Sequence, residues 1–68
     1  MQIQIQVNGS QRSVREGTTV SELIAELELV PEQVAVERNR ALVRRTEHGS
    51  TRLVAGDALE LVTLVGGG

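Results

Sequence analysis

The sequence contains no cysteine, no Phe, Tyr or Trp, and no lysine. Without cysteine, neither a disulfide nor a thiolate-bound metal can support this 68-residue fold. Without aromatic residues, Val, Leu and Ile must supply the core, with Ala filling gaps. The chain also lacks the rings on which nucleic-acid bases stack. These absences predict one small domain that is held together by aliphatic packing.

Positive charge is also scarce. Nine acidic residues outnumber seven arginines, so the net charge is -2, whereas nucleic-acid binding usually needs a basic excess. No apolar run approaches the roughly 20 residues that span a membrane. Gln2, Gln4 and Gln6 interrupt the apolar stretch that a signal peptide would need. We therefore expect a cytoplasmic protein that binds neither nucleic acid nor membranes.

Groups that could perform catalysis are few. His48 is the only histidine, and it lies in a polar stretch beside Gly49, where we expect it to be solvated. A metal site would need clustered ligands, which the sequence does not show. Asp57 follows Gly56 and is most simply a turn residue. No nucleophile–base pair, phosphate-binding loop or carboxylate dyad stands out. We expect a protein that is not an enzyme and binds no cofactor or metal.

The first part of the chain has the pattern of a β-hairpin. Residues 1–7 alternate between polar and apolar side chains, which predicts a half-buried strand with both isoleucines and Val7 facing the core. Asn8-Gly9 is a strong hairpin signal, because both residues tolerate positive φ. A second strand is expected over residues 11–15, with Val14 pointing inward.

A helix signal follows the hairpin. Thr19 and Glu22 are spaced as a capping box, in which each side chain bonds the other residue's main-chain N–H. The helix is expected to end near Leu29, because Pro31 disfavours helical geometry at the residue before it. Its predicted apolar face consists of Val20, Leu23, Ile24 and Leu27.

The rest of the chain reads as short strands and turns. We expect strands at 34–37, 41–44 and 58–65, a turn at Asn39-Arg40, a polar surface loop at 45–52, core residues Leu53 and Val54, and a turn at Gly56-Asp57. A right-handed crossover through the helix would lay the last strand beside the first, in parallel. The predicted fold class is α+β: a β-grasp, or ubiquitin-like, mixed sheet of four to five strands curved around one helix.

The chain ends on three glycines, Gly66, Gly67 and Gly68. Consecutive glycines pack no core and lose more conformational freedom on ordering than any other residue. Extended, they would reach roughly 10 Å and could enter a narrow channel of another protein. The sequence therefore predicts a domain over residues 1–65 and a flexible glycine tail over 66–68. The terminal carboxylate of Gly68 is the candidate reactive group.

The last predicted strand is apolar on both faces. Leu59 and Leu61 suit the inner face, so Val62 and Leu64 point outward beside the tail, next to Val65. An outward apolar cluster at this place is a candidate partner-docking patch. The alternative is that a bulge or a loop covers these side chains. Three arginines could steer the body onto an acidic partner or form a solvated face: Arg44, Arg45 and Arg52.

Several of these segments together resemble the ThiS family, the sulfur carriers of thiamine biosynthesis, over essentially the full chain. The resemblance rests on the hairpin at Asn8-Gly9, on residues 19–23, 34–39, 42–44 and 56–57, and most specifically on the terminus Val65-Gly66-Gly67-Gly68. Asn39-Arg40 departs from the Asn-Gly that often fills this turn in relatives. The departure concerns a turn and not the chemistry.

The resemblance implies a function. In the family, an enzyme similar to ubiquitin-activating enzymes uses ATP to adenylate the terminal glycine. A sulfur donor system then converts it to a thiocarboxylate, which gives its sulfur to thiazole synthase. Carried over, Gly68 would react, and Gly66 and Gly67 would form the slender tail. The alternatives are sulfur carriage for another product such as molybdopterin, a protein modifier joined through Gly68 to lysines, and a plain interaction module.

Overall fold

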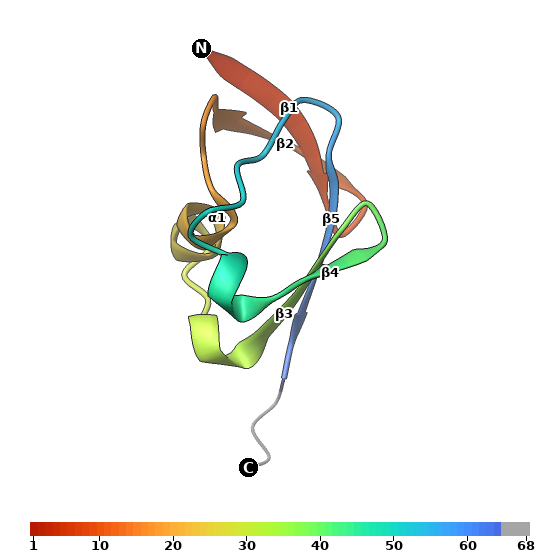
Figure 1. Cartoon of the computed structure of the whole chain (residues 1–68). Helices are drawn as coiled ribbons and strands as arrows, with labels where there is room; N and C mark the ends of the chain where they lie inside the picture. Colours follow the sequence, from red (N-terminus) through yellow and green to blue (C-terminus); the bar gives the residue numbers. More distant parts are fainter. Residues whose placement is uncertain (65–68) are drawn as a thin grey trace.

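The computed structural model describes residues 1–64. Five strands of this part of the chain form a single sheet, in the order β2-β1-β5-β3-β4, and one α-helix lies against it (Figure 1). Among residues 1–64, no helix is long and apolar enough to cross a membrane. In chain order, the elements are β1 (Gln2–Val7), β2 (Ser10–Arg15), α1 (Val20–Glu26), the 3-10 turn η1 (Pro31–Gln33), β3 (Val34–Arg38), β4 (Ala41–Val43), the 3-10 turn η2 (Arg45–Glu47) and β5 (Ala58–Thr63).

The first hairpin forms as the alternation predicts. β1 and β2 pair antiparallel, with Val7 opposite Ser10 next to the turn. Asn8 and Gly9 both have positive φ, 51° and 83°, which is the geometry of a type I′ turn. The inward side chains of the hairpin enter the core, because Ile5 is only 1% exposed and Val14 only 2%.

The helix begins at the predicted capping box. Glu22 N–H donates to Thr19 Oγ1 at 3.1 Å, and Thr19 N–H donates to Glu22 Oε1 at 2.9 Å. This reciprocal pair satisfies two main-chain donors that the first turn would otherwise leave free. Three residues of the predicted apolar face are fully buried against the sheet and a fourth is partly buried: Val20, Leu23 and Ile24, with Leu27 at the margin.

The helix ends earlier than predicted, at Glu26 and not near Leu29. Glu28 takes a left-handed conformation with φ 59°, and Leu29 N–H donates back to the carbonyl of Ile24 at 3.1 Å. This bond pattern is that of a Schellman motif, which closes a helix and turns the chain away from its axis. The prediction was wrong because this position usually carries glycine, so a glutamate gave no stop signal. Pro31 starts η1 instead.

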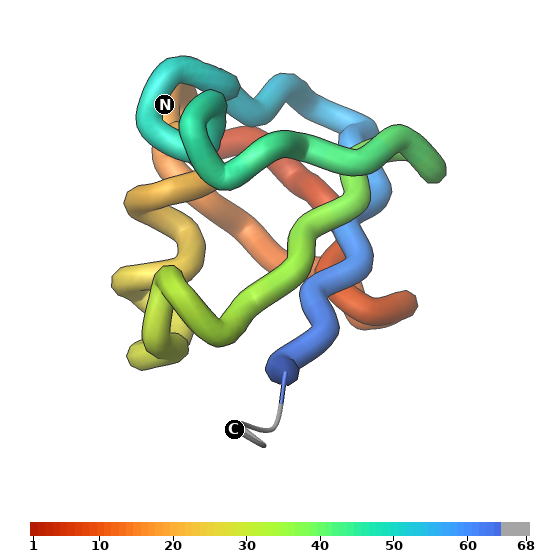
Figure 2. The backbone as a smooth tube through the Cα atoms, turned by 60° about the horizontal axis from the view of Figure 1, so that its bottom comes forward, coloured from red at the N-terminus to blue at the C-terminus, as the bar shows by residue number. Residues whose placement is uncertain are grey.

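The crossover brings the two ends of the fold together. β5 pairs in parallel with β1 at Gln6–Ala58 and Val7–Leu59, and antiparallel with β3 from Arg38–Leu59 to Val34–Thr63. The prediction of a parallel last strand is therefore confirmed. The curved sheet lies around α1 (Figure 2), and this arrangement is the β-grasp fold.

The segment between β4 and β5 differs from the predicted exposed loop. His48 is only 6% exposed, and its Nε2–H donates to the Val43 carbonyl at 3.1 Å. The carbonyl of His48 accepts the Ser21 N–H at 2.9 Å, so the loop is tied to the start of α1. This tertiary contact buries the ring that the sequence left in solvent. Leu53 enters the core as expected, whereas Val54 is 52% exposed, contrary to the prediction.

Candidate functional site

The end of β5 is the part of the described structure that leads to the glycine tail. On its β3 side the ladder continues to the strand's end, because Val62 pairs with Ala35, Thr63 pairs with Val34, and Leu64 N–H donates to the Gln33 carbonyl at 2.6 Å. On its other side, residues 1–64 show no β1–β5 pair beyond Leu59. β5 therefore runs past the end of β1 toward the C-terminus (Figure 1).

A side chain takes the place of the missing strand pair at Leu61. Leu61 N–H donates to Asn8 Oδ1 at 2.8 Å, and Asn8 Nδ2 donates to the Leu61 carbonyl at 3.2 Å. The main-chain N–H of Asn8 also donates to the Leu59 carbonyl at 2.9 Å. Sequence reasoning gave Asn8 a role only in the turn, because nothing in the local pattern indicates a contact 53 residues away.

The start of β5 is held by a buried polar network around Asp57, which is 3% exposed. Its carboxylate accepts Arg38 Nε–H at 2.9 Å, the Val54 N–H at 2.9 Å and Asn39 Nδ2–H at 3.1 Å. Asn39 Oδ1 in turn accepts the Ala58 N–H at 2.9 Å. Asp57 is thus a turn residue, as expected, and also the centre of a network that sequence reasoning missed.

The outward positions of β5 carry the apolar side chains that were predicted there. Val62 is 55% exposed and Leu64 is 51% exposed, so no loop of residues 1–64 buries them, while Leu59 and Leu61 are buried. Their exposure is confirmed, and a docking role stays a prediction. Val65, the third residue of the predicted patch, lies outside the described residues.

Cross-strand pairing extends this surface over β3 and β4. Val62 is opposite Ala35, and Leu42, which is 68% exposed, is opposite Glu37. Residues that pair across an antiparallel ladder point to the same face. We call the set Ala35, Leu42, Val62 and Leu64 the outer apolar surface.

Two carboxylates lie on the same face as the outer apolar surface. Glu37 and Glu60 pair directly across β3 and β5, and neither forms a salt bridge within residues 1–64. Like charges placed directly opposite each other destabilise a sheet. This face therefore combines exposed apolar side chains with two carboxylates that form no salt bridge within residues 1–64, and Arg40 lines the same hollow as these carboxylates.

The three arginines singled out from the sequence are all exposed. Arg45 donates to the Glu32 carbonyl at 2.9 Å, and Arg52 donates to the Gly17 carbonyl at 3.4 Å. Arg44 directly precedes η2. Two of these side chains thus support local loops, which favours the interpretation of a solvated face.

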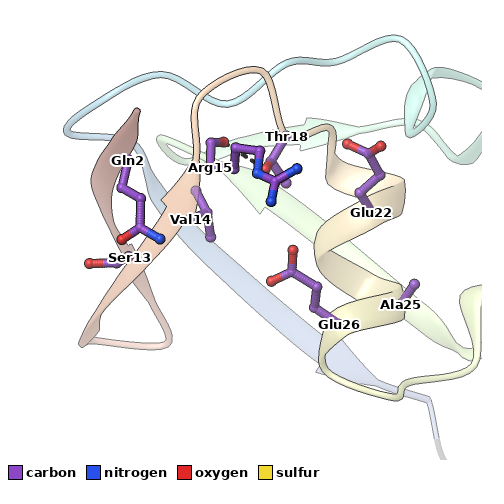
Figure 3. A pocket seen from close by; sticks show the side chains of 8 residues that line it. All are labelled: Gln2, Ser13, Val14, Arg15, Thr18, Glu22, Ala25 and Glu26. Atoms are coloured by element: carbon purple, nitrogen blue, oxygen red, sulfur yellow. Dashed lines mark hydrogen bonds between the residues drawn. The ribbon is translucent and has the colours of Figure 1, made fainter.

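A hollow of about 410 Å³ lies away from β5, between β2 and α1 (Figure 3). Three of its polar side chains are used in local structure: Thr18 Oγ1 donates to the Arg15 carbonyl at 2.6 Å, Ser13 Oγ accepts from the Gln4 amide, and Glu22 belongs to the capping box. Within residues 1–64, no three His, Asp or Glu side chains are grouped so as to hold a metal ion.

The predicted reactive tail itself, Gly66, Gly67 and Gly68, lies outside the described residues, as does the predicted domain boundary at residue 65. What the structure describes is the chain up to Leu64, the residue before that boundary. Leu64 is bonded to the end of η1 and follows directly on β5. The candidate site therefore consists of the end of β5, the Asn8 contact and the outer apolar surface.

Comparison with known proteins places this arrangement in a family. The model of the ThiS family matches residues 5–68. A thiazole synthase of Magnetococcus marinus is 41% identical over 66 residues, which are 97% of this chain and 20% of that protein, so the chain spans about one fifth of this relative's length. The sulfur carrier protein ThiS of Bacillus subtilis is 32% identical over 65 residues, covering 94% of this chain and 98% of that protein.

A solved structure agrees with the sequence comparisons. The crystal structure of the thiamine biosynthesis protein ThiS from Geobacter metallireducens superposes with a TM-score of 0.82 at 33% identity, and the match covers 97% of this chain and all of that one. Fold and sequence thus agree over nearly the whole chain, and the family match continues through Gly68. The chain belongs to the ThiS family.

Proposed function

We propose that this chain carries sulfur, as a thiocarboxylate on Gly68, for formation of the thiazole of thiamine. The observation that supports this most is the family match, because it extends to residue 68 and so includes the glycine tail. The similarity to the sulfur carrier of Bacillus subtilis over nearly that protein's whole length supports the same role.

The proposed reaction requires the carboxyl group of Gly68 to be positioned in a partner's active site. It requires no catalytic side chain from this chain. An oxygen of the Gly68 carboxylate attacks the α-phosphorus of ATP, which gives an acyl adenylate and releases pyrophosphate. A hydrosulfide equivalent from a sulfur donor system then forms a C–S bond at the acyl carbon, and AMP leaves. A separate adenylating enzyme supplies the nucleotide site and the charge stabilisation. In this proposal the chain is a co-substrate and not an enzyme.

The proposed acceptor of the sulfur is a thiazole synthase. Two proteins of that name, from Magnetococcus marinus and Paramagnetospirillum magneticum, each match nearly the whole of this chain over about a fifth of their own length. A segment of this type that lies within a synthase supports the view that the carrier works beside that enzyme.

The outer apolar surface is the proposed docking face for the adenylating enzyme. Val62 lies on β5 and Leu64 directly follows this strand, so a partner seated on the surface is close to the segment that continues to Gly68. Burial of exposed Val and Leu side chains stabilises such a complex by about 25 cal/mol per Å² of apolar area. The Glu37–Glu60 pair on the same face would suit a basic side chain of the partner.

The test measures the intact mass of the 68-residue chain after coexpression with a ubiquitin-activating-like enzyme and a sulfur donor system. We expect the mass gain that corresponds to replacement of one oxygen by sulfur. The gain should be lost in Gly67→Ala, because a side chain would obstruct a narrow channel. The matched control is Gly49→Ala, since an added Cβ there meets no atom within 4 Å.

Each other outcome has a definite meaning. An unchanged mass in the wild type refutes sulfur carriage. Adducts on lysines of other proteins indicate a protein modifier. A thiocarboxylate that purified thiazole synthase does not consume indicates a carrier for another product. A normal gain in Gly67→Ala would refute the narrow-channel part of the proposal.

A further inference from the structure

We infer that Asn8 is a positioning residue for the reactive tail, because its side-chain amide holds the end of β5 from which that tail continues. The inference rests on the proposed function for its consequence, but its structural part can be measured without any enzyme. It starts from the unequal pairing of β5 with its two neighbouring strands. β1 pairs with only two residues of β5, Ala58 and Leu59.

Asn8 continues the β1–β5 ladder after its own main chain has turned away. Its φ of 51° belongs to the hairpin turn. Its amide nevertheless offers Leu61 one acceptor and one donor, at 2.8 Å and 3.2 Å. These two bonds satisfy the Leu61 N–H and carbonyl, the main-chain groups that a longer β1 would have bonded, so the side chain replaces a further step of the ladder.

The Asn8–Leu61 contact marks a boundary in β5. Up to Leu61 the strand has bonded or paired neighbours on both sides, and beyond Leu61 it has them on one side only. Leu61 has a neighbour on both sides, since it lies opposite Val36 of β3 while its main-chain N–H and carbonyl are bonded by Asn8. Beyond it, the β3 pairs and the bond from Leu64 to the Gln33 carbonyl hold the strand from one side only. Without the amide, the one-sided part would begin two residues earlier, after Leu59, and would include Leu61 in addition to residues 62–64, which β3 and η1 hold from one side in either case.

The turn role and the positioning role of Asn8 can be separated by substitution. A type I′ turn accepts glycine as readily as asparagine at this position. Asn8→Gly therefore preserves the turn and removes only the amide. Asn8→Asp is the second variant, because it keeps an acceptor for the Leu61 N–H but loses the donor.

The second hairpin supplies a matched control. Asn39 occupies the corresponding turn position with φ 53°, and its amide bonds to Ala58 and Asp57, at the opposite end of β5. Asn39→Gly thus makes the same chemical change in the same kind of turn. It should loosen the start of the strand and leave the end near the tail unaffected.

The first measurement uses the free chain. We expect amide hydrogen exchange at Leu61 to become about tenfold faster in Asn8→Gly, which corresponds to a lost bond of ordinary strength. The ¹⁵N order parameters of Thr63 and Leu64 should fall in this variant and not in Asn39→Gly. Unchanged exchange at Leu61 and unchanged order parameters would overturn the inference at its structural level.

The second measurement uses ATP–pyrophosphate exchange by the adenylating enzyme, with the chain as the varied substrate and at a temperature where all variants are folded. We expect KM to rise about fivefold in Asn8→Gly, with kcat unchanged, because binding must now order a looser strand. Asn8→Asp should give a smaller rise, and Asn39→Gly none. A wild-type KM in Asn8→Gly, despite faster exchange at Leu61, would show a purely structural role and overturn the positioning role.

The two proposals fail in different ways. If the wild-type chain supports no pyrophosphate exchange, the proposed function fails, and the positioning role in activation fails with it, while the exchange data on the free chain still decide whether Asn8 holds β5. If the wild type is active and the Asn8 variants match it, only the positioning role fails.

Discussion

The two ends of β5 are held in opposite ways. The start of the strand carries a buried carboxylate, Asp57, with three hydrogen bonds, and lies between β1 and β3. The end of the strand carries exposed Val62 and Leu64, and beyond Leu61 it is paired on one side only. One strand thus joins a fixed base to an end that is presented to solvent.

The difference shows that one strand of a small domain can combine a firmly held start with an end that is held less firmly. Local opening requires least free energy where main-chain hydrogen bonds are exposed and apolar contacts are few. That description fits the end of β5 and not its start. The base of the strand is fixed within the fold, and the end of the described strand is open to solvent. Three substitutions test this contrast, from the largest expected effect to the smallest.

Asp57→Ala should have the largest effect, because it removes the carboxylate from the base of β5. Arg38 and two other donors would lose their acceptor. We expect the free energy of unfolding to fall by about 3 kcal/mol. Urea denaturation, followed by far-UV circular dichroism, measures this loss.

The control for Asp57→Ala is Glu60→Ala, which also removes a carboxylate from this region but one that is exposed and outside any salt bridge of residues 1–64. It should change stability little, or raise it slightly, because Glu37 loses a like charge opposite it. Equal losses in the two variants would contradict the special role of Asp57.

Val62→Glu should have an intermediate effect, on binding and not on stability. It places a charge in the outer apolar surface, where the side chain is already 55% exposed. KM for the chain in pyrophosphate exchange should rise about tenfold, which corresponds to about 1.4 kcal/mol. Thermal unfolding should stay near that of the wild type.

Val54→Glu is the matched control for Val62→Glu. Val54 is exposed to a similar extent, 52%, but precedes the start of β5 and lies outside the outer apolar surface. Its KM should remain that of the wild type. If the two variants raise KM equally, added negative charge anywhere on the body explains the effect, and the docking face is refuted.

Arg40→Gly should have the smallest effect, and in the stabilising direction. Arg40 has φ 72°, which is strained for a residue with a Cβ, in the turn that holds the base of β5. Glycine relieves this strain, and we expect a gain of about 0.5–1 kcal/mol in the free energy of unfolding. Gly9→Ala imposes the reverse change at φ 83° in the other hairpin and should lose stability. A loss in Arg40→Gly would contradict this account of the turn.

Much of the fold could be predicted because its signals are local. The alternation in β1, the Asn8-Gly9 turn, the Thr19–Glu22 capping box and the inward side of β5 all follow from spacing and residue type within a few positions. The parallel pairing of β5 with β1 followed from the order of elements and the handedness rule, and it is confirmed.

The errors fall where residue type alone gives no signal of the burial or the backbone conformation that the structure shows. His48 looked solvated but is covered because its loop bonds to the start of α1. Val54 looked like a core residue, but only its neighbour Leu53 is buried. The helix ended early because Glu28 adopts a conformation for which its sequence gives no signal.

The candidate site likewise has features that the sequence predicted and features that it did not. By itself, the sequence determined the glycine terminus, the outward placement of Val62 and Leu64, and the family resemblance, since each can be read from short segments of residues without knowing their contacts. Only the tertiary structure decided that Asn8 bonds to Leu61, that Asp57 anchors the base of β5, and that Leu42 and Ala35 extend the exposed surface. The physical reason is that a hydrogen bond or a shared face between residues far apart in the chain depends on strand register, which no local pattern specifies.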